Sequence, residues 1–524
     1  MDFEVQEAEW RRIDEVFIDH ANRAPTAPCV SFEGDHWNWL EVNSLVDQFA
    51  VAFKACGVSA GDRIALLSTP RPEYLLVLMA ASRIGAVYVG LNPRYKAGEV
   101  AEALSRAAPR LLITLRSFEG QEFLELIKSA GAVVKLPPIV AFESVATCLD
   151  ALRMLSVAQS QAIETPLPKV AASDAAAIVF TSGTTGKPKA AMLSHKGLLL
   201  AASVQHARLN SRLPRYLCNL PVNHVGCLMN LTLSALVGGG SIVFQQRFSA
   251  AGSLQLIRDE RVNCWLQVPA MFHECVRDPS FVPEDLRHLN SICIGGGAVS
   301  VQTLAKLRQI GVPVFVEYGQ TETTSSGSYS DDGATDEVLT HCIGRFDPHF
   351  EFRIANTENQ PCAIGEVGEI QARGPLIFVG YFADPVATAE AFSADGWLHT
   401  GDLAMHRADG NVVLQGRSKE MIKSGGYNVY PREVEQLLET HPGISQVVVV
   451  GLPDERYGEA VHAVISCSNA IVKVEELKDL CRQKLANYKV PKSVRVIPAF
   501  PLLSNGKIDR VGTRNLASEL PLLD

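Results

Sequence analysis

The chain has 524 residues, more than one hydrophobic core usually supports, so we expect a large domain and at least one smaller one. Hydrophobic residues make up 47% of it and charged residues 20%, which excludes the disordered and fibrous classes. The formal net charge of -9 leaves no basic excess, which argues against nucleic acid as a partner.

The N-terminal part shows no export or membrane signal. Its first residues, MDFEVQEAEWRRIDEVF, are acidic and amphipathic, unlike a basic stretch followed by an apolar core. The most apolar run, Tyr74 to Ala81, is too short for a bilayer, which needs about 20 residues, so we expect a buried helix there. The twelve cysteines include no CxxC pair and no zinc-ligand spacing. We therefore expect a cytoplasmic protein without a membrane span.

Short β-rich runs alternate with helical stretches through the first two-thirds of the chain. This rhythm is typical of βαβ units and mainly parallel sheets. We expect two such sheets, separated near Ser156 to Pro168, a polar stretch with no clear period. The expected strands are Arg63 to Ser68, Leu111 to Thr114, Ile139 to Phe142, Ala177 to Thr181, Ser241 to Phe244, Ser291 to Ile294 and Val314 to Tyr318.

The pattern changes after about Thr340, where short strands separated by turns predict a small β-rich subdomain. Beyond Arg417 a compact α+β segment follows. It contains a helix opened by Pro431, a buried strand from Val447 to Val450 and a second helix from Val474 to Leu485.

The expected fold is therefore α/β with two domains. The large N-terminal domain, residues 1–416, contains two α/β subdomains with mainly parallel sheets and a small β-barrel-like subdomain. The small C-terminal domain, residues 417–524, is α+β.

The segment TSGTTGKPKA, Thr181 to Ala190, directly follows an apolar strand. Its glycines let the backbone approach phosphate oxygens, its hydroxyl and N–H groups donate to them, and Lys187 or Lys189 balances their charge. It is not a Walker A loop, because its glycines are only three apart and a proline follows the first lysine. The alternative is a flexible surface turn. The strand before the loop and the paired lysines favour a polyphosphate site.

Six further motifs follow TSGTTGKPKA along the chain. They are PVNH at Pro221 to His224, GGGAV at Gly295 to Val299, YGQTE at Tyr318 to Glu322, TGD at Thr400 to Asp402, GRSKEMIKSGGYNVYP from Gly416, and SNGK ending at Lys507. In these motifs and their order the chain resembles the adenylate-forming superfamily of acyl-CoA synthetases, adenylation domains of nonribosomal peptide synthetases, and luciferases. The resemblance covers nearly the whole chain.

The YGQTE motif has a physical rationale for binding ATP and Mg²⁺. Tyr318 can stack on adenine, Thr321 can donate to a phosphate, and Glu322 offers a hard oxygen ligand for a magnesium ion. The resemblance implies these same roles, with Thr184 as a second hydroxyl near the metal and phosphates. The residues expected to bind nucleotide or coenzyme A are Thr181, Ser182, Gly183, Thr184, Thr185, Gly186, Lys187, Lys189, Gly296, Gly297, Glu317, Tyr318, Gly319, Thr321, Asp402, Arg417, Lys423, Gly425 and Gly426.

Three charged residues of the later motifs also acquire roles from the resemblance. Asp402 accepts both ribose hydroxyls, and Arg417 contacts the same sugar or the phosphate. Lys507 compensates the charge that builds up as a carboxylate attacks the α-phosphate. Taken alone, Asp402 is more typical of a turn cap and Lys507 of a solvated turn, so their place in the series carries these roles.

The acid site and the mobile part follow from the same resemblance. His224 corresponds to an aromatic gate between the acid pocket and the thiol tunnel, and Val225, Gly297 and Ser325 contact the acid. Lys419 resembles the hinge about which the C-terminal domain rotates, and Gly425 and Gly426 would leave room for pantetheine, although they could equally form a plain turn. The expected catalytic residues are Lys507, His224, Glu322 and Thr184.

The resemblance implies an ATP-dependent ligase that forms an acyl-adenylate from a carboxylic acid and passes the acyl group to coenzyme A. Small, polar and apolar residues at the expected pocket favour a small to medium or aromatic acid. We expect a monomer or a homodimer. The alternatives are a stand-alone adenylation enzyme that loads a carrier protein, and a luciferase-like oxygenase or non-catalytic adenylate-binding protein.

Overall fold

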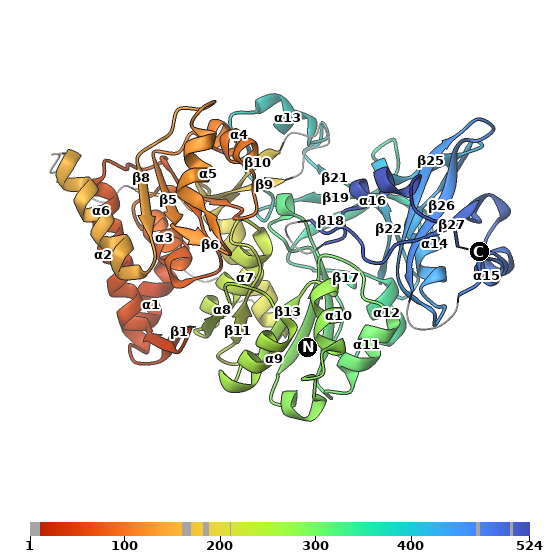
Figure 1. Ribbon diagram of the computed structural model, residues 1–524, viewed down its shortest axis with the longest axis horizontal. Helices are drawn as coiled ribbons and strands as arrows, with labels where there is room; N and C mark the ends of the chain where they lie inside the picture. Colours follow the sequence, from red (N-terminus) through yellow and green to blue (C-terminus); the bar gives the residue numbers. More distant parts are fainter. Residues whose placement is uncertain are drawn as a thin grey trace.

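The computed structural model of the chain describes residues 11–159, 169–181, 188–209, 211–467, 472–503 and 507–523 (Figure 1). All seven strands expected from the sequence are present, with ends shifted by at most two residues. The chain forms two large sheets covered by helices, then a small antiparallel sheet and a C-terminal α+β unit. The α/β fold class expected from the sequence is confirmed.

One large sheet has seven strands, and its central strands are parallel. Strand β10 runs antiparallel to β9 and to β20, so the segment TSGTTGKPKA joins two neighbouring strands at this side of the sheet. The strands, in order across the sheet, are β20 (Gly380–Tyr381), β10 (Lys189–Ser194), β9 (Ala175–Thr181), β4 (Val87–Leu91), β3 (Arg63–Leu67), β5 (Leu111–Leu115) and β8 (Ile139–Phe142).

Helices α2 and α3 show why this part folds as it does. Asn38 caps α2 (Trp39–Ala55) through a capping box with Glu41, and Pro72 begins α3 (Pro72–Arg83). Every residue of α3 is buried, so the buried helix expected from the apolar run is confirmed. No helix in the described ranges is both long and apolar enough to cross a bilayer. The remaining helices of this part are α1 (Glu15–Arg23), α4 (Ala97–Ala107), α5 (Phe123–Ala130) and α6 (Val145–Gln159).

The second large sheet has nine strands, most of them parallel. The strands, in order across the sheet, are β17 (Arg345–Phe346), β16 (Ser328–Tyr329), β15 (Val314–Tyr318), β14 (Ser291–Gly295), β13 (Cys264–Gln267), β11 (Arg215–Cys218), β12 (Ser241–Phe244), β1 (Pro28–Phe32) and β2 (Asp35–Asn38).

Side chains of the second sheet alternate between two apolar cores, as the period of a strand requires. Cys293 and Phe315 belong to the largest core, together with residues of α7 (His195–Leu209), η1 (Gly226–Leu233) and α8 (Ser234–Val237). Ile294 and Val316 belong to a second core. That core also contains residues of α9 (Ala250–Asp259), α10 (Pro269–Arg277) and α11 (Val301–Arg308). The sheet therefore presents two distinct faces to its helices.

The sheet boundary expected near Ser156 to Pro168 is wrong. Strands β1 and β2, which come first in the chain, belong to the nine-stranded sheet, whereas β9 and β10, which come after that segment, belong to the seven-stranded sheet. Ser156 itself lies within α6. Neighbouring strands of a parallel sheet are joined by crossover connections and can be far apart in the sequence. A polar stretch therefore need not mark the boundary between two sheets.

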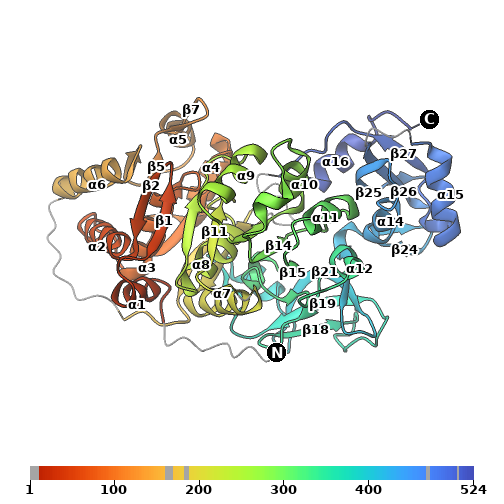
Figure 2. The same cartoon turned by 90° about the horizontal axis from the view of Figure 1, so that it is seen from below.

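A four-stranded antiparallel sheet follows, with strands in the order β18 (Glu351–Ala355), β19 (Gly368–Arg373), β21 (Leu398–His406) and β22 (Val412–Arg417). After the short turn η4 (Ser418–Glu420), the chain enters the last sheet, which contains β23 (Ile422–Ser424), β24 (Tyr427–Val429), β25 (Ile444–Asp454), β26 (Gly458–Cys467) and β27 (Ser493–Val496). Helices α14 (Pro431–Leu438), α15 (Val474–Lys484) and α16 (Arg510–Ala517) pack on it (Figure 2). The two helices and the buried strand expected here are confirmed.

Candidate functional site

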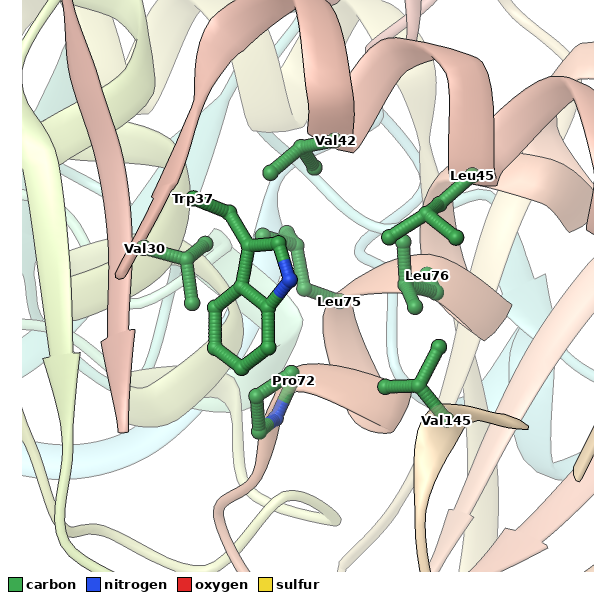
Figure 3. A pocket seen from close by; sticks show the side chains of 8 residues that line it. All are labelled: Val30, Trp37, Val42, Leu45, Pro72, Leu75, Leu76 and Val145. Carbon is green, nitrogen blue, oxygen red and sulfur yellow. The ribbon is translucent and has the colours of Figure 1, made fainter. Parts of the chain in front are cut away.

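The candidate site lies where strands of several sheets end. Gly295 and Tyr318 end the parallel neighbours β14 and β15, and Asp402 and Arg417 face each other across β21 and β22. In α/β folds, ligands bind beyond the carboxyl ends of parallel strands. The small apolar cavity beneath α2, lined by Val30, Trp37, Val42, Leu45, Pro72, Leu75, Leu76 and Val145, offers almost no polar group and is no comparable site (Figure 3).

Asp402 lies at the centre of a charged cluster. The Tyr318 hydroxyl donates to its Oδ2 at 2.7 Å, and the Nε of Arg417 lies 3.0 Å from its Oδ1. Burial raises the pKa of Asp402, while Arg417, Tyr318 and Lys507 act in the opposite direction. The side chain of Arg417 is 55% exposed, so this pair opens toward solvent. Tyr318 and Arg417 thus both contact Asp402, and the structure brings together three residues that were expected to bind adenine and ribose.

Lys507 reaches this cluster from the C-terminal unit. A Cβ added at Gly296 would lie 2.8 Å from its Cε and 3.2 Å from its Nζ, and Gly296 has a φ of +78°. A side chain at position 296 would collide with Lys507 and would be strained by the positive φ, and both effects explain why the residue is glycine. Burial lowers the pKa of Lys507, and Arg417 lowers it further, whereas Asp402 and Glu317 raise it. The lysine is therefore held at the end of β14, close to Asp402.

A network of ion pairs ties the segment of Lys507 to the turn that precedes the last sheet. Arg510 Nε lies 2.9 Å from Glu420 Oε2, and its Nη2 lies 2.6 Å from Oε1 of the buried Glu435. Glu420 directly follows the exposed Lys419, the expected hinge residue. One guanidinium thus connects the turn that contains Lys419 with the segment that contains Lys507.

Glu322 anchors a second group of residues beside the phosphate loop. Its Oε1 accepts hydrogen bonds from Tyr381 Oη at 2.8 Å and from Thr181 Oγ1 at 3.4 Å. Lys189 Nζ lies 4.6 Å from the centroid of the Tyr381 ring. A cation, two hydroxyls and a carboxylate therefore surround the start and the end of the loop. The loop residues predicted to bind phosphate, Ser182, Gly183, Thr184, Thr185, Gly186 and Lys187, lie outside the described residues.

The residues present suit a magnesium ion only in part. Within the described ranges, no group of three or more histidine, cysteine, aspartate or glutamate side chains is placed to hold a metal. Magnesium bound together with nucleotide needs only one or two carboxylates, because phosphates and waters complete its shell. Glu322 fits that requirement.

His224 lies two residues before a π-helix, η1. The N–H of Gly226 donates to its Nδ1 at 3.1 Å. Burial and the nearby Lys507 lower the pKa of His224 to about 3, so its imidazole is neutral at physiological pH. Val225, which immediately precedes η1, is buried. Short π-helical turns are rare and occur frequently at functional sites.

A polar network surrounds Asn230, which lies on the same helix. Asn230 Nδ2 donates to Glu317 Oε1 at 2.9 Å, and Ser325 Oγ donates to Asn230 Oδ1 at 2.6 Å. Burial raises the pKa of Glu317 to about 8. Ser325 has a φ of +63°, and its backbone lies 2.3 Å from where a Cβ of Gly319 would be. Gly319 thus lets the YGQTE turn fold back and bring Ser325 to Asn230.

The residues expected to line a pantetheine path lie on the β23–β24 hairpin. Gly425 and Gly426 have φ values of +58° and +84° and form its turn. The N–H of Gly425 donates to the carbonyl of Tyr457, and the N–H of Lys423 donates to Glu459. These contacts remain within the C-terminal unit, so the structure brings Lys507 to the charged cluster without the hairpin.

Sequence reasoning did not identify Tyr381, Asn230 and Arg510. Asn230 carried a usable signal, because it is a polar residue inside the apolar run CLMNLTL, six positions after His224. Tyr381 carried none, since its partner Glu322 is 59 positions away. Arg510 follows Lys507 by three positions, but its partners only become neighbours in the folded chain.

Comparisons with known proteins match most of the chain. Residues 17–382 match the family model described as AMP-binding enzyme, and residues 433–507 match the AMP-binding enzyme C-terminal domain. The indoleacetate–CoA ligase of Aromatoleum aromaticum is 33% identical, covering 96% of this chain and 98% of that protein. The mitochondrial medium-chain acyl-CoA ligase ACSF2 of Bos taurus is 30% identical, covering 94% and 85%. ATP-bound MatB from Rhodopseudomonas palustris matches with a TM-score of 0.85 at 25% identity, covering 97% and 99%.

Proposed function

Because the chain belongs to the AMP-binding enzyme family and is an AMP-forming acid–CoA ligase, we propose that it activates an aromatic or medium-chain carboxylic acid. The acid and ATP form an acyl-adenylate and pyrophosphate, and coenzyme A then takes the acyl group and releases AMP. The observation that carries this proposal is the position of Lys507 against Gly296, beside the Asp402 cluster.

In the first half-reaction, an oxygen of the acid carboxylate attacks the α-phosphorus of ATP, and the bond to pyrophosphate breaks. This step needs positioning and neutralisation of charge, and it needs no protein nucleophile. Lys507 supplies a cation whose three donors can follow the charge from the carboxylate to the phosphate. Its lowered pKa reflects a position where water is excluded and electrostatic effects are strong.

Asp402 and its partners bind the nucleoside in this proposal. A carboxylate has about four acceptor positions, so Asp402 can keep its bonds to Tyr318 and Arg417 while it accepts from a ribose hydroxyl. The partly exposed Arg417 remains available to the sugar or phosphate. Glu322 would hold a magnesium ion with Thr184, and a bound ion would neutralise charge on the ATP phosphates.

The second half-reaction requires a different arrangement of the C-terminal part. We assign the domain boundary to residues 416 and 417, with Lys419 as the hinge, since one sheet ends at Arg417 and the next begins at Ile422. A rotation there would withdraw Lys507 and bring Lys423, Gly425 and Gly426 toward the adenylate. The neutral imidazole of His224 could turn aside for the thiol without the cost of moving a buried charge.

The acid class is supported by the relatives and by the site. Indoleacetate and medium-chain acids are named for two relatives of similar length. The acid would contact Val225, Gly297 and Ser325. They offer an apolar side chain, the space left by a missing side chain, and a hydroxyl group, respectively. This combination suits a ring or a short chain that carries a polar substituent.

The test is pyrophosphate release by the purified chain with magnesium ATP, across a panel of aromatic and medium-chain acids. The assay is run with and without coenzyme A, and mass spectrometry identifies the products. Acid-dependent pyrophosphate together with an acyl-CoA mass would support the ligase. Release of pyrophosphate without formation of acyl-CoA would indicate that a carrier protein, and not coenzyme A, accepts the acyl group. Absence of turnover with every acid would contradict the proposal.

A further inference from the structure

The direction of the hydrogen bonds around Asn230 is determined by a backbone carbonyl. Gln205 Nε2 donates to the carbonyl oxygen of Asn230 at 2.7 Å, and that oxygen can only accept. The Oε1 of Gln205 therefore faces Asn230 Nδ2, which donates to it at 2.6 Å. Asn230 Nδ2 donates its other hydrogen to Glu317, while its Oδ1 accepts from Ser325. The orientation of both amides is thus settled by the network.

It follows that Oε1 of Glu317 is an acceptor. The other oxygen, Oε2, is buried and has no hydrogen-bond partner among the described residues. Burial raises the pKa of Glu317 to about 8, which favours the protonated form at neutral pH. Because Oε1 accepts, the proton belongs on Oε2. A buried O–H donor without an acceptor is costly, and few such groups are retained in folded proteins without a reason.

The titratable groups that surround Glu317 come from several elements. Cys293 on β14 contributes a thiol, which is a weak donor, and Tyr216 on β11 and Tyr329 on β16 are neutral phenols whose pKa values are raised by burial. Burial raises the pKa of Glu317 by more than the Asn230 hydrogen bond, the Cys293 thiol and the nearby cation Lys507, in that order, lower it. The balance of these groups leaves the carboxyl neutral.

Glu317 and Lys507 contact consecutive residues of the same strand end. A Cβ added at Gly295 would lie 2.5 Å from Glu317 Oε1, and one added at Gly296 would lie 2.8 Å from Lys507 Cε. Consecutive Cα atoms are about 3.8 Å apart. The carboxyl group of Glu317 is therefore close to Lys507, which would meet the carboxylate of the acid.

We infer that Glu317 is a specificity-determining residue whose Oε2–H donates a hydrogen bond to a hydroxyl or carbonyl oxygen carried by the acid substrate. This inference rests on the proposed ligase function and narrows its substrate class to acids with an oxygen substituent. An acid that lacks this oxygen leaves the buried donor unsatisfied, which corresponds to a loss of about 10- to 100-fold in kcat/KM.

The test uses matched pairs of aromatic and medium-chain acids that differ by one hydroxyl or keto oxygen. Pyrophosphate release gives the ratio of kcat/KM for each pair, and calorimetry gives the ratio of affinities independently of turnover. For the wild-type chain we expect one substituent position at which the oxygen-bearing acid is favoured by about 10-fold or more. The Glu317→Leu variant should reduce that ratio to about one.

The Glu317→Gln variant keeps the geometry, since its Oε1 can accept from Asn230 while its Nε2 donates in place of Oε2. It should retain the preference for the oxygen-bearing acid. In the wild type this preference should decline near pH 8, where Glu317 ionises, and in the variant it should not. This variant keeps the test decisive if Glu317→Leu does not fold.

Gln267→Leu is the matched control. Gln267 is also buried, and its side-chain amide has no hydrogen-bond partner among the described residues. It pairs with Ile294 and therefore faces the second apolar core, opposite to Glu317, so the acid ratio should not change.

The possible outcomes separate the inference from the proposed function. Strong turnover with ratios of about one for every pair would overturn the inference and leave the ligase function standing. Equal affinities within the pairs would overturn it even if turnover were absent. A preference for amino-bearing acids would also contradict it, because Glu317 would then act as a carboxylate.

Discussion

The Asp402 cluster and the Glu317 network lie beside consecutive glycines of one strand end, yet their electrostatics differ. The Asp402 cluster contains a carboxylate, a guanidinium and an ammonium group, and it opens toward solvent through Arg417. The Glu317 network is partly buried and is held together by an amide, a hydroxyl and a protonated carboxyl. The comparison indicates that charge is concentrated where phosphate chemistry is proposed, whereas the proposed acid side uses neutral donors.

The largest effect should come from removing the cation of the charged side. Lys507→Ala should lower acid-dependent pyrophosphate release by about 100- to 1000-fold, because a donor to developing charge is lost. Thermal unfolding should change little. Lys484→Ala, at an exposed position of α15, is the control and should leave the rate unchanged. If Lys507→Ala kept a rate close to that of the wild type, the proposed difference between the Asp402 cluster and the Glu317 network would be contradicted.

Asp402→Asn should have the next largest effect. It removes the charge that pairs with Arg417 but keeps the size of the side chain, so we expect the KM for ATP to rise by about 10- to 100-fold. The KM for the acid should stay within about twofold, since the acid is proposed to bind on the neutral side. Steady-state kinetics with each substrate varied separately measures both values. A parallel rise in both would show that the two sides are not independent.

Ionisation of Glu317 should make the free energy of unfolding depend on pH. The pKa of Glu317 is raised from 4.5 to about 8, so between these values the folded chain holds a proton that the unfolded chain has lost. The wild type therefore loses stability from this group as pH rises from about 5 to 8. Glu317→Gln should gain at least about 1.4 kcal/mol relative to the wild type over this range, the equivalent of one pKa unit. Denaturant unfolding at pH 5 and pH 8 tests this, and parallel curves would contradict it.

The smallest effect is expected at the neutral hydroxyl beside Glu322. Tyr381→Phe removes one hydrogen bond to Oε1 while Thr181 remains, which corresponds to about 0.5–1.5 kcal/mol, or less than about 20-fold in kcat/KM for ATP. Tyr457→Phe, in the C-terminal unit, is the control. A loss as large as that of Lys507→Ala would show that Tyr381 takes part directly in the chemistry.

Much of the fold could be predicted because its signals are local. Each expected strand is a short apolar run, and Pro72 and Pro431 begin helices in which the missing N–H costs nothing. The order of sheets was not readable, because β1 pairs with β12 across more than 200 residues of chain. Pairing of this kind is decided by which apolar faces meet in the folded state, and no local pattern records it.

The candidate site divides in the same way. The sequence by itself determined the candidate residues, since the spacing of glycines, hydroxyls and charges in TSGTTGKPKA, YGQTE and TGD is a property of neighbours. Only the tertiary structure decided that Lys507 meets Gly296, and that one oxygen of Glu317 accepts from Asn230 while the other remains without a partner. A side chain's charge state and free donors depend on burial and on partners from distant elements, which exist only once the chain has folded.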